Sequence, residues 1–328
     1  MMRRDAMAIG LAAAALATLP TANAAADDTI VATVPRSTPV DVYAGHTLWS
    51  TWDGKAYRLT DYSAGAARTL PVAASVAPFD ADVGSDANGD PVAVYARCRR
   101  APLAPWGLDG RRGCDLYAYR FATGREVRIA RANSRADEYY PAVWRGRIAF
   151  TRAYRDGRRA LYWRKLGRAG ASHRLRGGPT GDPAVPADLD MRFGTVAFVW
   201  RYEFGSELRL ATTTGKGRRL VRIPGSGAAA NQLAAQGPSI AGGSVYWMLS
   251  VGGDDPVWSR IRRVRIASGR QQQATTRIDA DPSLPRATEG FGHDRSASWY
   301  VRDVAPDRFE IHRVTGLRYE TADPIVLE

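Results

Sequence analysis

The sequence predicts an all-β protein, a six-bladed β-propeller made of four-stranded antiparallel blades. Two observations predict it: a recurring pair of glycine turns along the chain, and short alternating strands between these turns with no sustained helical period. Repeated units of about 45–55 residues, each forming one small sheet, bury their faces by stacking around an axis. Five or seven blades are the alternative counts.

One stretch of aromatic, β-branched and arginine residues shows the repeat most clearly. It predicts strands at 141–145, 147–153, 160–166 and 173–176, with turns at Gly146, Asp156-Gly157 and Gly167. We expect the aromatic side chains of this unit to pack mainly between blades and its arginines to point to solvent or to cap edges.

Two series of glycines mark the turns of every unit. The first, between strands one and two, is Gly45, Gly89, Gly146, Gly194, Gly243 and Gly292. The second, between strands three and four, is Gly65, Gly124, Gly167, Gly215, Gly269 and Gly316. Tight turns need the positive φ that glycine adopts without strain. The two glycines of a unit lie 20, 35, 21, 21, 26 and 24 positions apart, and the long unit contains an insertion between Cys98 and Cys114.

The two ends of the chain predict how the ring closes. Residues Thr29–Val34 form a β-rich stretch before the first blade, and Asp323–Leu327 end the last one. We expect the N-terminal stretch to pair into the final blade and lock the ring.

The first residues predict export. Met1–Arg4 is a basic head, Ala6–Leu19 is apolar, and Ala22-Asn23-Ala24 offers small residues for cleavage. Residues 1–24 are therefore predicted to be a signal peptide cleaved near Ala24, and residues 25–328 a single propeller domain. The apolar run is shorter than the ~20 residues of a membrane span, so we expect a secreted or cell-envelope protein.

The cysteines and the net charge indicate the compartment of the protein and the class of partner that it can bind. Cys98 and Cys114 are predicted to form a disulfide, as fits an oxidising compartment. The net charge of +13 comes almost wholly from arginine and predicts weak attraction to anionic polymers of a cell envelope. The arginines are spread along the chain instead of clustered, and we therefore expect no nucleic-acid partner.

Two of the units carry a family resemblance. They read Pro78-Phe79-Asp80, Asp86–Asp90 and Val94-Tyr95, then Pro141, Arg145-Gly146 and Ile148–Phe150. A strand entered through proline, a polar glycine turn and a hydrophobic-aromatic strand resemble the TolB-type propeller repeat. The characteristic Ser-Pro-Asp-Gly turn of that repeat is intact in no unit. The resemblance implies the fold, an exported compartment and a leaning toward protein binding.

Carboxylates recur on the predicted innermost strands, where Pro-x-Asp repeats. The candidates for a ring in the central channel are Asp41, Asp80, Asp82, Asp188, Asp190 and Glu289. Such a ring would suit Ca²⁺ or a cationic ligand group, because Ca²⁺ takes several oxygen ligands. The alternative is that these carboxylates only solvate the channel or pair with arginines.

The insertion between the cysteines is the candidate surface for a partner. Its candidate residues are Arg99, Arg100, Trp106, Leu108, Arg111 and Arg112. Loops on a rigid scaffold often carry binding, and tryptophan with arginine is typical of interface hot spots. An ordinary long hairpin, with Trp106 folded onto the blade, is the alternative.

Catalytic motifs are missing from the sequence. There is no Gly-x-Ser-x-Gly motif, no phosphate-binding glycine loop and no zinc spacing, and only four histidines occur. We therefore expect a monomeric binding module without catalysis, for an exported protein or an anionic envelope polymer, with Ca²⁺ as the one cofactor considered. The alternative function is a carbohydrate-active hydrolase that uses Asp41, Asp190 and Glu289.

Overall fold

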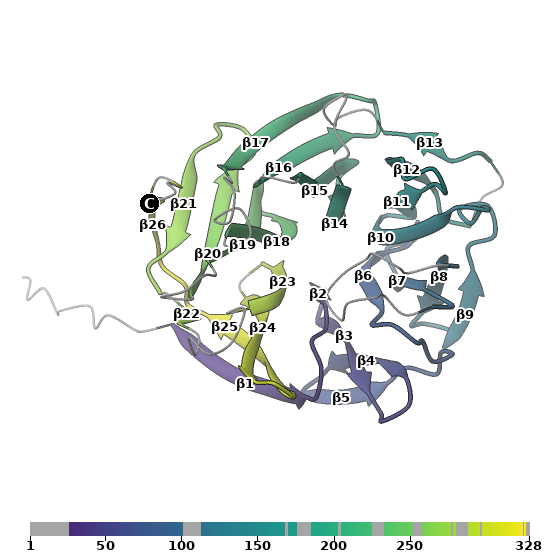
Figure 1. Cartoon of the computed structure of the whole chain (residues 1–328), viewed down its shortest axis with the longest axis horizontal. Coiled ribbons are helices and arrows are strands. Elements are labelled where there is room, and N and C mark those ends of the chain that lie inside the picture. The colour runs from purple at the N-terminus through teal and green to yellow at the C-terminus, as the bar shows by residue number, and fades with distance from the viewer. Residues whose placement is uncertain are drawn as a thin grey trace, which may run out of the picture.

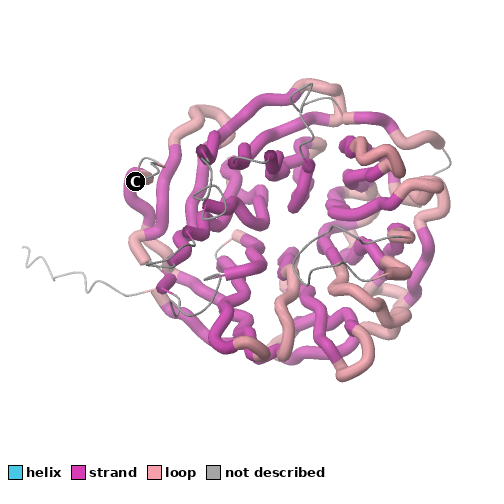
Figure 2. Tube along the Cα trace, viewed as in Figure 1, coloured by secondary structure: helices cyan, strands magenta, loops and turns pink. Residues whose placement is uncertain are grey.

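Six antiparallel sheets stand around a common axis, and the predicted six-bladed propeller is confirmed (Figure 1). The computed structural model describes residues 26–100, 113–167, 170–175, 185–202, 205–224, 233–251, 258–276, 278–279, 288–295, 297–323 and 325. Across these residues the chain consists of strands and loops, without a helix (Figure 2).

The first three blades follow one another along the chain, each running from the axis outward. Blade 1 contains β2 (Val40–Tyr43), β3 (His46–Trp52), β4 (Tyr57–Ser63) and β5 (Ala66–Thr69). Blade 2 contains β6 (Asp80–Ser85), β7 (Pro91–Arg97), β8 (Asp115–Arg120) and β9 (Arg125–Arg128). Blade 3 contains β10 (Asp137–Trp144), β11 (Arg147–Ala153), β12 (Arg159–Lys165) and β13 (His173–Arg174), close to the predicted boundaries.

The remaining blades have the same order, with additions in the fifth. Blade 4 contains β14 (Val185–Arg192), β15 (Thr195–Tyr202), β16 (Gly205–Thr212) and β17 (Gly217–Pro224). Blade 5 contains β18 (Leu233–Ala241), β19 (Ser244–Val251), β20 (Trp258–Arg265) and β21 (Gln271–Ala274), joined by β22 (Ile278–Asp279) and β26 (Tyr319–Thr321). Blade 6 contains β23 (Thr288–Asp294), β24 (Ala297–Ala305), β25 (Arg308–Thr315) and β1 (Asp27–Val34).

The N-terminal strand closes the ring, as predicted. β1 pairs antiparallel with β25 and becomes the outermost strand of blade 6. Asp28 on β1 accepts hydrogen bonds from the Tyr300 hydroxyl at 2.6 Å and from His312 at 2.9 Å. After β25 the chain crosses back to blade 5, where β26 pairs with β21. Both ends of the propeller are therefore tied into neighbouring blades.

Both glycine series lie at one end of the blades, because the first and third turns of an antiparallel sheet share an end. We call this end of the propeller the turn face. All six glycines of the second series have positive φ, from 64° to 89°. In the first series Gly292 was wrongly placed: it lies inside β23, packed against the backbone of Asp41, and the turn of blade 6 follows at Arg295.

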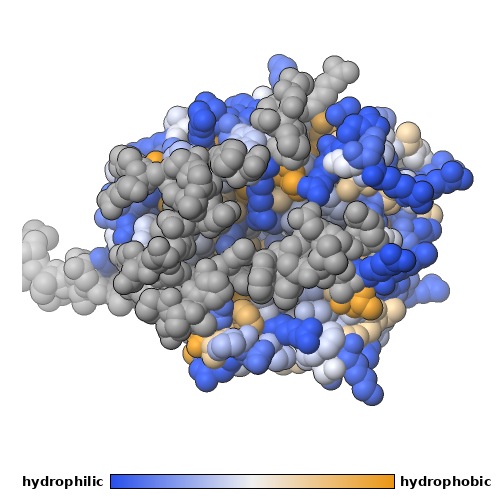
Figure 3. Space-filling view, viewed as in Figure 1, coloured by the Kyte–Doolittle hydropathy of each residue, from blue (hydrophilic) through white to orange (hydrophobic). Residues whose placement is uncertain are grey.

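The core lies between the blades. Tyr139, Phe150 and Phe198 belong to one buried cluster drawn from blades 2, 3 and 4, which confirms the predicted packing of the aromatic unit. The face visible in Figure 3 is mostly hydrophilic around its rim, with small hydrophobic patches. The expectation that the arginines of this unit point to solvent or cap edges fails at Arg164, which is buried. Arg192 and Arg262, in other blades, are buried as well.

Candidate binding site at the central axis

Six strands surround the axis and place the candidate site. Neighbouring innermost strands contact each other in the closed order β2, β6, β10, β14, β18, β23 and back to β2. Alternate residues of a strand share one face, so positions such as 41 and 43, or 190 and 192, point to the same side. The side chains of these strands therefore meet in layers around the axis.

Three predicted channel carboxylates bind the next blade instead of standing open. The Val83 amide donates to Asp41 Oδ2 at 2.7 Å, and the Val143 amide donates to Asp82 Oδ2 at 2.5 Å. Asp190 accepts the amide of Ile240. Each bond runs from the innermost strand of one blade to the backbone of the following blade. These aspartates therefore hold the blades in register around the ring.

Every junction between blades carries a side-chain-to-backbone bond of this kind. Asp80, a fourth predicted carboxylate, accepts the Tyr140 amide at 2.5 Å. In blade 3 the corresponding residue is Ala142, whose side chain cannot accept a hydrogen bond. Thr151 Oγ1 of blade 3 instead donates to the Pro186 carbonyl of blade 4 at 2.9 Å. Ser239 and His293 join blades 5 and 6, and Asp294 accepts the Ala44 amide at 3.1 Å to join blades 6 and 1. The repeated Pro-x-Asp pattern thus has a structural role.

A buried arginine offsets part of the negative charge of this layer. Arg192 is 6% exposed and interacts electrostatically with Asp190, Asp82, Asp41 and Asp294. We call these five residues the axial cluster. Burial, together with the charge of Asp190, raises the pKa of Asp41 to about 6, and burial also raises the pKa of Asp82 and Asp190. The negative charge of Asp41 adds to the effect of burial on Asp82, so the two neighbouring carboxyl groups raise each other's cost of ionisation.

The other two predicted carboxylates stand apart from the axial cluster. Asp188 forms an ion pair with Arg201 at 2.6 Å and sits at a bulge of β14 with φ of 47°. Glu289 lies on β23, and its side chain is outside the described part of the structure. Within the described ranges, no group of three or more His, Cys, Asp or Glu is arranged to hold a metal ion.

Aromatic rings cover the axial cluster on the turn face. The Arg192 guanidinium lies 4.5 Å from the Tyr43 ring and 4.7 Å from the Trp144 ring. Tyr43 and Trp144 meet edge to face at 5.5 Å, and Phe193 meets Trp144 at 5.2 Å. We call Tyr43, Trp144 and Phe193 the aromatic cap. Cation–π contact of a desolvated arginine is favourable, so the cap and the cluster support each other.

Phe193 is the exposed end of this cap. It is 80% exposed although it touches Trp144. It occupies the first turn position between β14 and β15 with φ of 50°, followed by Gly194 at 75°. A two-residue hairpin turn with both φ values positive prefers asparagine, aspartate or glycine, and a bulky residue there is strained. The fold itself gives no reason for phenylalanine at this position.

The cysteine-bounded insertion is only partly described. Cys98 and Cys114 form the predicted disulfide and are buried. Arg99 and Arg100 follow β7 and are exposed. The candidates Trp106, Leu108, Arg111 and Arg112 lie outside the described residues, so their role in binding stays a prediction.

Sequence reasoning missed Arg192 and the aromatic cap. Counting charges on the innermost strands showed the carboxylates, but the contact between Arg192 and residues from three other blades depends on the closed ring. A signal for Phe193 was present in the sequence, because it is a large aromatic residue directly before a turn glycine. The sequence analysis did not single out this residue.

The fold and this site define a six-bladed propeller closed by its N-terminal strand, with a neutralised acidic axis under an aromatic cap. No known family model matches the sequence, and no curated protein matches it. Among the described residues, we found no helix with the length and apolar character needed to cross a membrane.

Solved structures share the fold at low sequence identity. A protein from Agrobacterium tumefaciens described as a TolB has TM-score 0.53 and 11% identity, covering 87% of this chain and 93% of its own. TolB from Acinetobacter baumannii has TM-score 0.49 and 12% identity, covering 76% of this chain and 55% of its own. A puromycin-hydrolyzing peptidase from Mycobacterium tuberculosis has TM-score 0.49 and 14% identity, covering 89% of this chain and 53% of its own.

The similarity to the Agrobacterium structure confirms the predicted TolB-like propeller at the level of the fold. The chain spans little more than half the length of the Acinetobacter TolB and of the mycobacterial peptidase. Propellers occur in binding proteins and in parts of enzymes, so the fold alone assigns no activity.

Proposed function

We propose that this chain is an exported, non-catalytic binding propeller that holds a protein partner at its turn face. The observation that carries the proposal is Phe193, an 80% exposed aromatic side chain on a strained backbone at the rim of the aromatic cap. Strained, non-optimal residues concentrate at functional sites, and exposed aromatics anchored on a rigid scaffold are typical interface hot spots.

The state of the axial carboxylates supports binding over hydrolysis. Asp41 and Asp190, two of the three candidates for glycoside hydrolysis, accept backbone amides and interact with Arg192. A hydrolase needs two carboxyl groups that reach the scissile bond from either side. Carboxylates engaged in holding blades together and neutralised by a buried cation are poorly suited to that task.

Export forms the second half of the proposal. Residues 1–24 have the pattern of a secretory signal peptide, and they lie outside the described residues. A buried disulfide between Cys98 and Cys114 agrees with an oxidising compartment. Mass spectrometry of the chain recovered from outside the cytoplasm should show an N-terminus near Ala25. Recovery of a full-length chain with reduced cysteines would contradict export.

Site-specific photocrosslinking tests the binding proposal. A photoreactive phenylalanine analogue at position 193 should capture one envelope or secreted protein, whereas the same analogue at position 127 should not. Val127 is a matched control because it is also exposed, at 45%, but lies on the outer strand β9. Protease digestion of the adduct distinguishes a protein from an anionic polymer, which is the competing partner.

A substitution separates binding from folding at the same position. Phe193→Asn places a residue that tolerates positive φ in the turn, so the free energy of unfolding should rise by about 1 kcal/mol. Affinity for the captured partner should fall about 30-fold, the loss expected of a hot-spot residue. Unchanged affinity in Phe193→Asn, or capture of carbohydrate only, would rule out a protein partner anchored by Phe193.

A further inference from the structure

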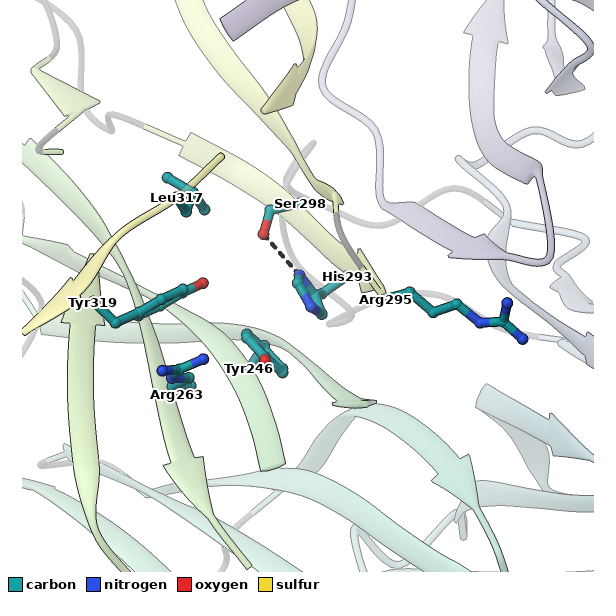
Figure 4. Close-up of a pocket in the computed structure, with 7 residues that line it drawn as sticks. All are labelled: Tyr246, Arg263, His293, Arg295, Ser298, Leu317 and Tyr319. Atoms are coloured by element: carbon teal, nitrogen blue, oxygen red, sulfur yellow. Dashed lines mark hydrogen bonds between the residues drawn. The ribbon is translucent and has the colours of Figure 1, made fainter. Parts of the chain in front are cut away.

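A pocket separate from the axial cluster lies between blades 5 and 6. Its volume is about 290 Å³, and it opens at the turn face near the crossing strand β26. Its lining residues come from β19, β20, β23, β24, β26 and the adjoining turns: Tyr246, Arg263, His293, Arg295, Ser298, Leu317 and Tyr319 (Figure 4). The volume lies at the lower end for small-molecule sites, so a ligand here would be small.

The lining contains arginine and no carboxylate. The Arg263 guanidinium lies 4.0 Å from the Tyr319 ring and donates through Nε to Gln272 at 3.0 Å. Within the described ranges no carboxylate forms an ion pair with Arg263. The acidic residues next to His293 and Tyr319 in the chain are used elsewhere, because Asp294 accepts the Ala44 amide and Glu320 accepts from Gln273. The pocket therefore has positive charge to offer a ligand.

A buried histidine supplies an unused polar atom. The His293 ring is 4% exposed and stacks on Tyr246 with 3.6 Å between ring centres. Its Nδ1 lies 2.8 Å from the hydroxyl of Ser298, whereas its Nε2 is buried without a hydrogen-bond partner. Burial, helped by the charge of Arg263, lowers the pKa of His293 to about 4, so the ring is neutral near pH 7. We assign the tautomer in which Ser298 donates to Nδ1, so that Nε2 carries the hydrogen and can donate.

Tyr319 adds a second hydroxyl to the pocket. It is buried and has no hydrogen-bond partner of normal geometry, although the Ser298 side chain lies close enough to act on its pKa. Figure 4 shows this hydroxyl and the His293 ring directed into the same space, while the Arg295 side chain extends away from it. Burial raises the pKa of Tyr319, so the hydroxyl keeps its hydrogen. Buried donors without acceptors cost free energy, and a ligand with acceptor oxygens would relieve that cost.

We propose that the pocket between blades 5 and 6 binds a small oxyanion, a carboxylate or phosphate group carried by a ligand of about monosaccharide size. Arg263 supplies the charge, and His293 Nε2 and the Tyr319 hydroxyl donate hydrogen bonds. The site is distinct from Phe193, and the ligand would contact both final blades and the crossing strand β26 at once. Because the ligand binds only the folded ring, its binding also stabilises ring closure.

Calorimetric titration and thermal melting of the chain spanning residues 25–328 test the proposal. The probes are D-glucuronate, inorganic phosphate and D-glucose as the neutral counterpart of D-glucuronate. At least one of the two anions should bind and raise the melting temperature, and D-glucose should do neither. Binding of D-glucuronate alone would identify a carboxylate ligand, binding of phosphate alone a phosphate ligand, and binding of both would support the shared oxyanion chemistry.

Single substitutions distinguish anion binding in this pocket from the general attraction of anions to a positively charged protein. Arg263→Gln should weaken anion binding at least tenfold, and Tyr319→Phe, which keeps the ring, should weaken it about threefold. Arg270→Gln removes the same charge from an exposed turn of the same blade and should bind as the wild type does. Failure of both anions to bind, equal binding of D-glucose, or an equal loss in Arg270→Gln would overturn the proposal. None of these results bears on capture at Phe193.

Discussion

Asp41→Asn should make the protein more stable at neutral pH, although it removes a buried charged residue. Asparagine keeps the side-chain oxygen that accepts the Val83 amide at 2.7 Å, so the bond between blades 1 and 2 is preserved. It removes the charge that burial and the neighbouring Asp190 disfavour. The substitution thereby separates the two roles of the aspartate, which are blade contact and membership of the axial cluster.

The size of the effect follows from the pKa. Burial and the charge of Asp190 raise the pKa of Asp41 from 3.8 to about 6, so the folded chain holds this proton more tightly than the unfolded chain. The contribution to stability is complete below pH 3.8 and is lost as pH rises through about 6, a total of about 3 kcal/mol. Between pH 5 and pH 7.5 the free energy of unfolding of the wild type should fall by about 1.4 kcal/mol as this contribution is lost.

Thermal and urea unfolding at pH 5 and pH 7.5 measure the effect. At pH 7.5 Asp41→Asn should exceed the wild type by up to about 3 kcal/mol, or roughly 6 °C in melting temperature. The advantage should shrink by about half at pH 5. The other charged groups that act on Asp41 are Asp190, Arg192 and Asp82, and they are present in both proteins.

A matched substitution guards against a general effect of charge. Asp156 lies in an exposed turn where the hydrogen bond from Arg158 lowers its pKa, so Asp156→Asn should give no stabilisation at pH 7.5. The reasoning is refuted if Asp41→Asn is less stable than the wild type at pH 7.5. It is also refuted if the difference between the two proteins is the same at pH 5 and pH 7.5.

Three further changes test other parts of the structure. Deleting Asp27–Val34 removes the strand that closes blade 6 and should lower the melting temperature by several degrees, and an unchanged melting curve would contradict ring closure by β1. Replacing Cys98 and Cys114 together by serine should cost about 3 kcal/mol in urea unfolding under non-reducing conditions, and no loss would show that the insertion is held by other contacts. Adding Ca²⁺ or EDTA should leave the melting temperature unchanged because backbone amides and Arg192 already engage the axial carboxylates, whereas a calcium-dependent rise that Asp82→Ala abolishes would restore the calcium hypothesis.

The repeat was readable because it depends on local physics. Positive φ at tight turns selects glycine, and alternation of side chains selects strand patterns, so blade 3 was placed within a few residues from sequence alone. The same logic misplaced Gly292, where glycine is needed for another reason, which is the close approach of the β2 backbone around Asp41. A close approach between chain segments about 250 residues apart leaves no local pattern to recognise.

The amino-acid sequence by itself determined the blades, the disulfide pair and the strand that closes the ring, because each follows from turn chemistry or short-range spacing. Only the tertiary structure decided what the carboxylates do. Asp41, Asp82 and Asp190 come from three blades, and their hydrogen bonds to amides of the next blade exist only once the ring is closed. The same holds for the electrostatic interaction of Asp41 and Asp82 with Arg192. The exposure of Phe193 and the unused donors of His293 and Tyr319 likewise arise from how neighbouring blades meet.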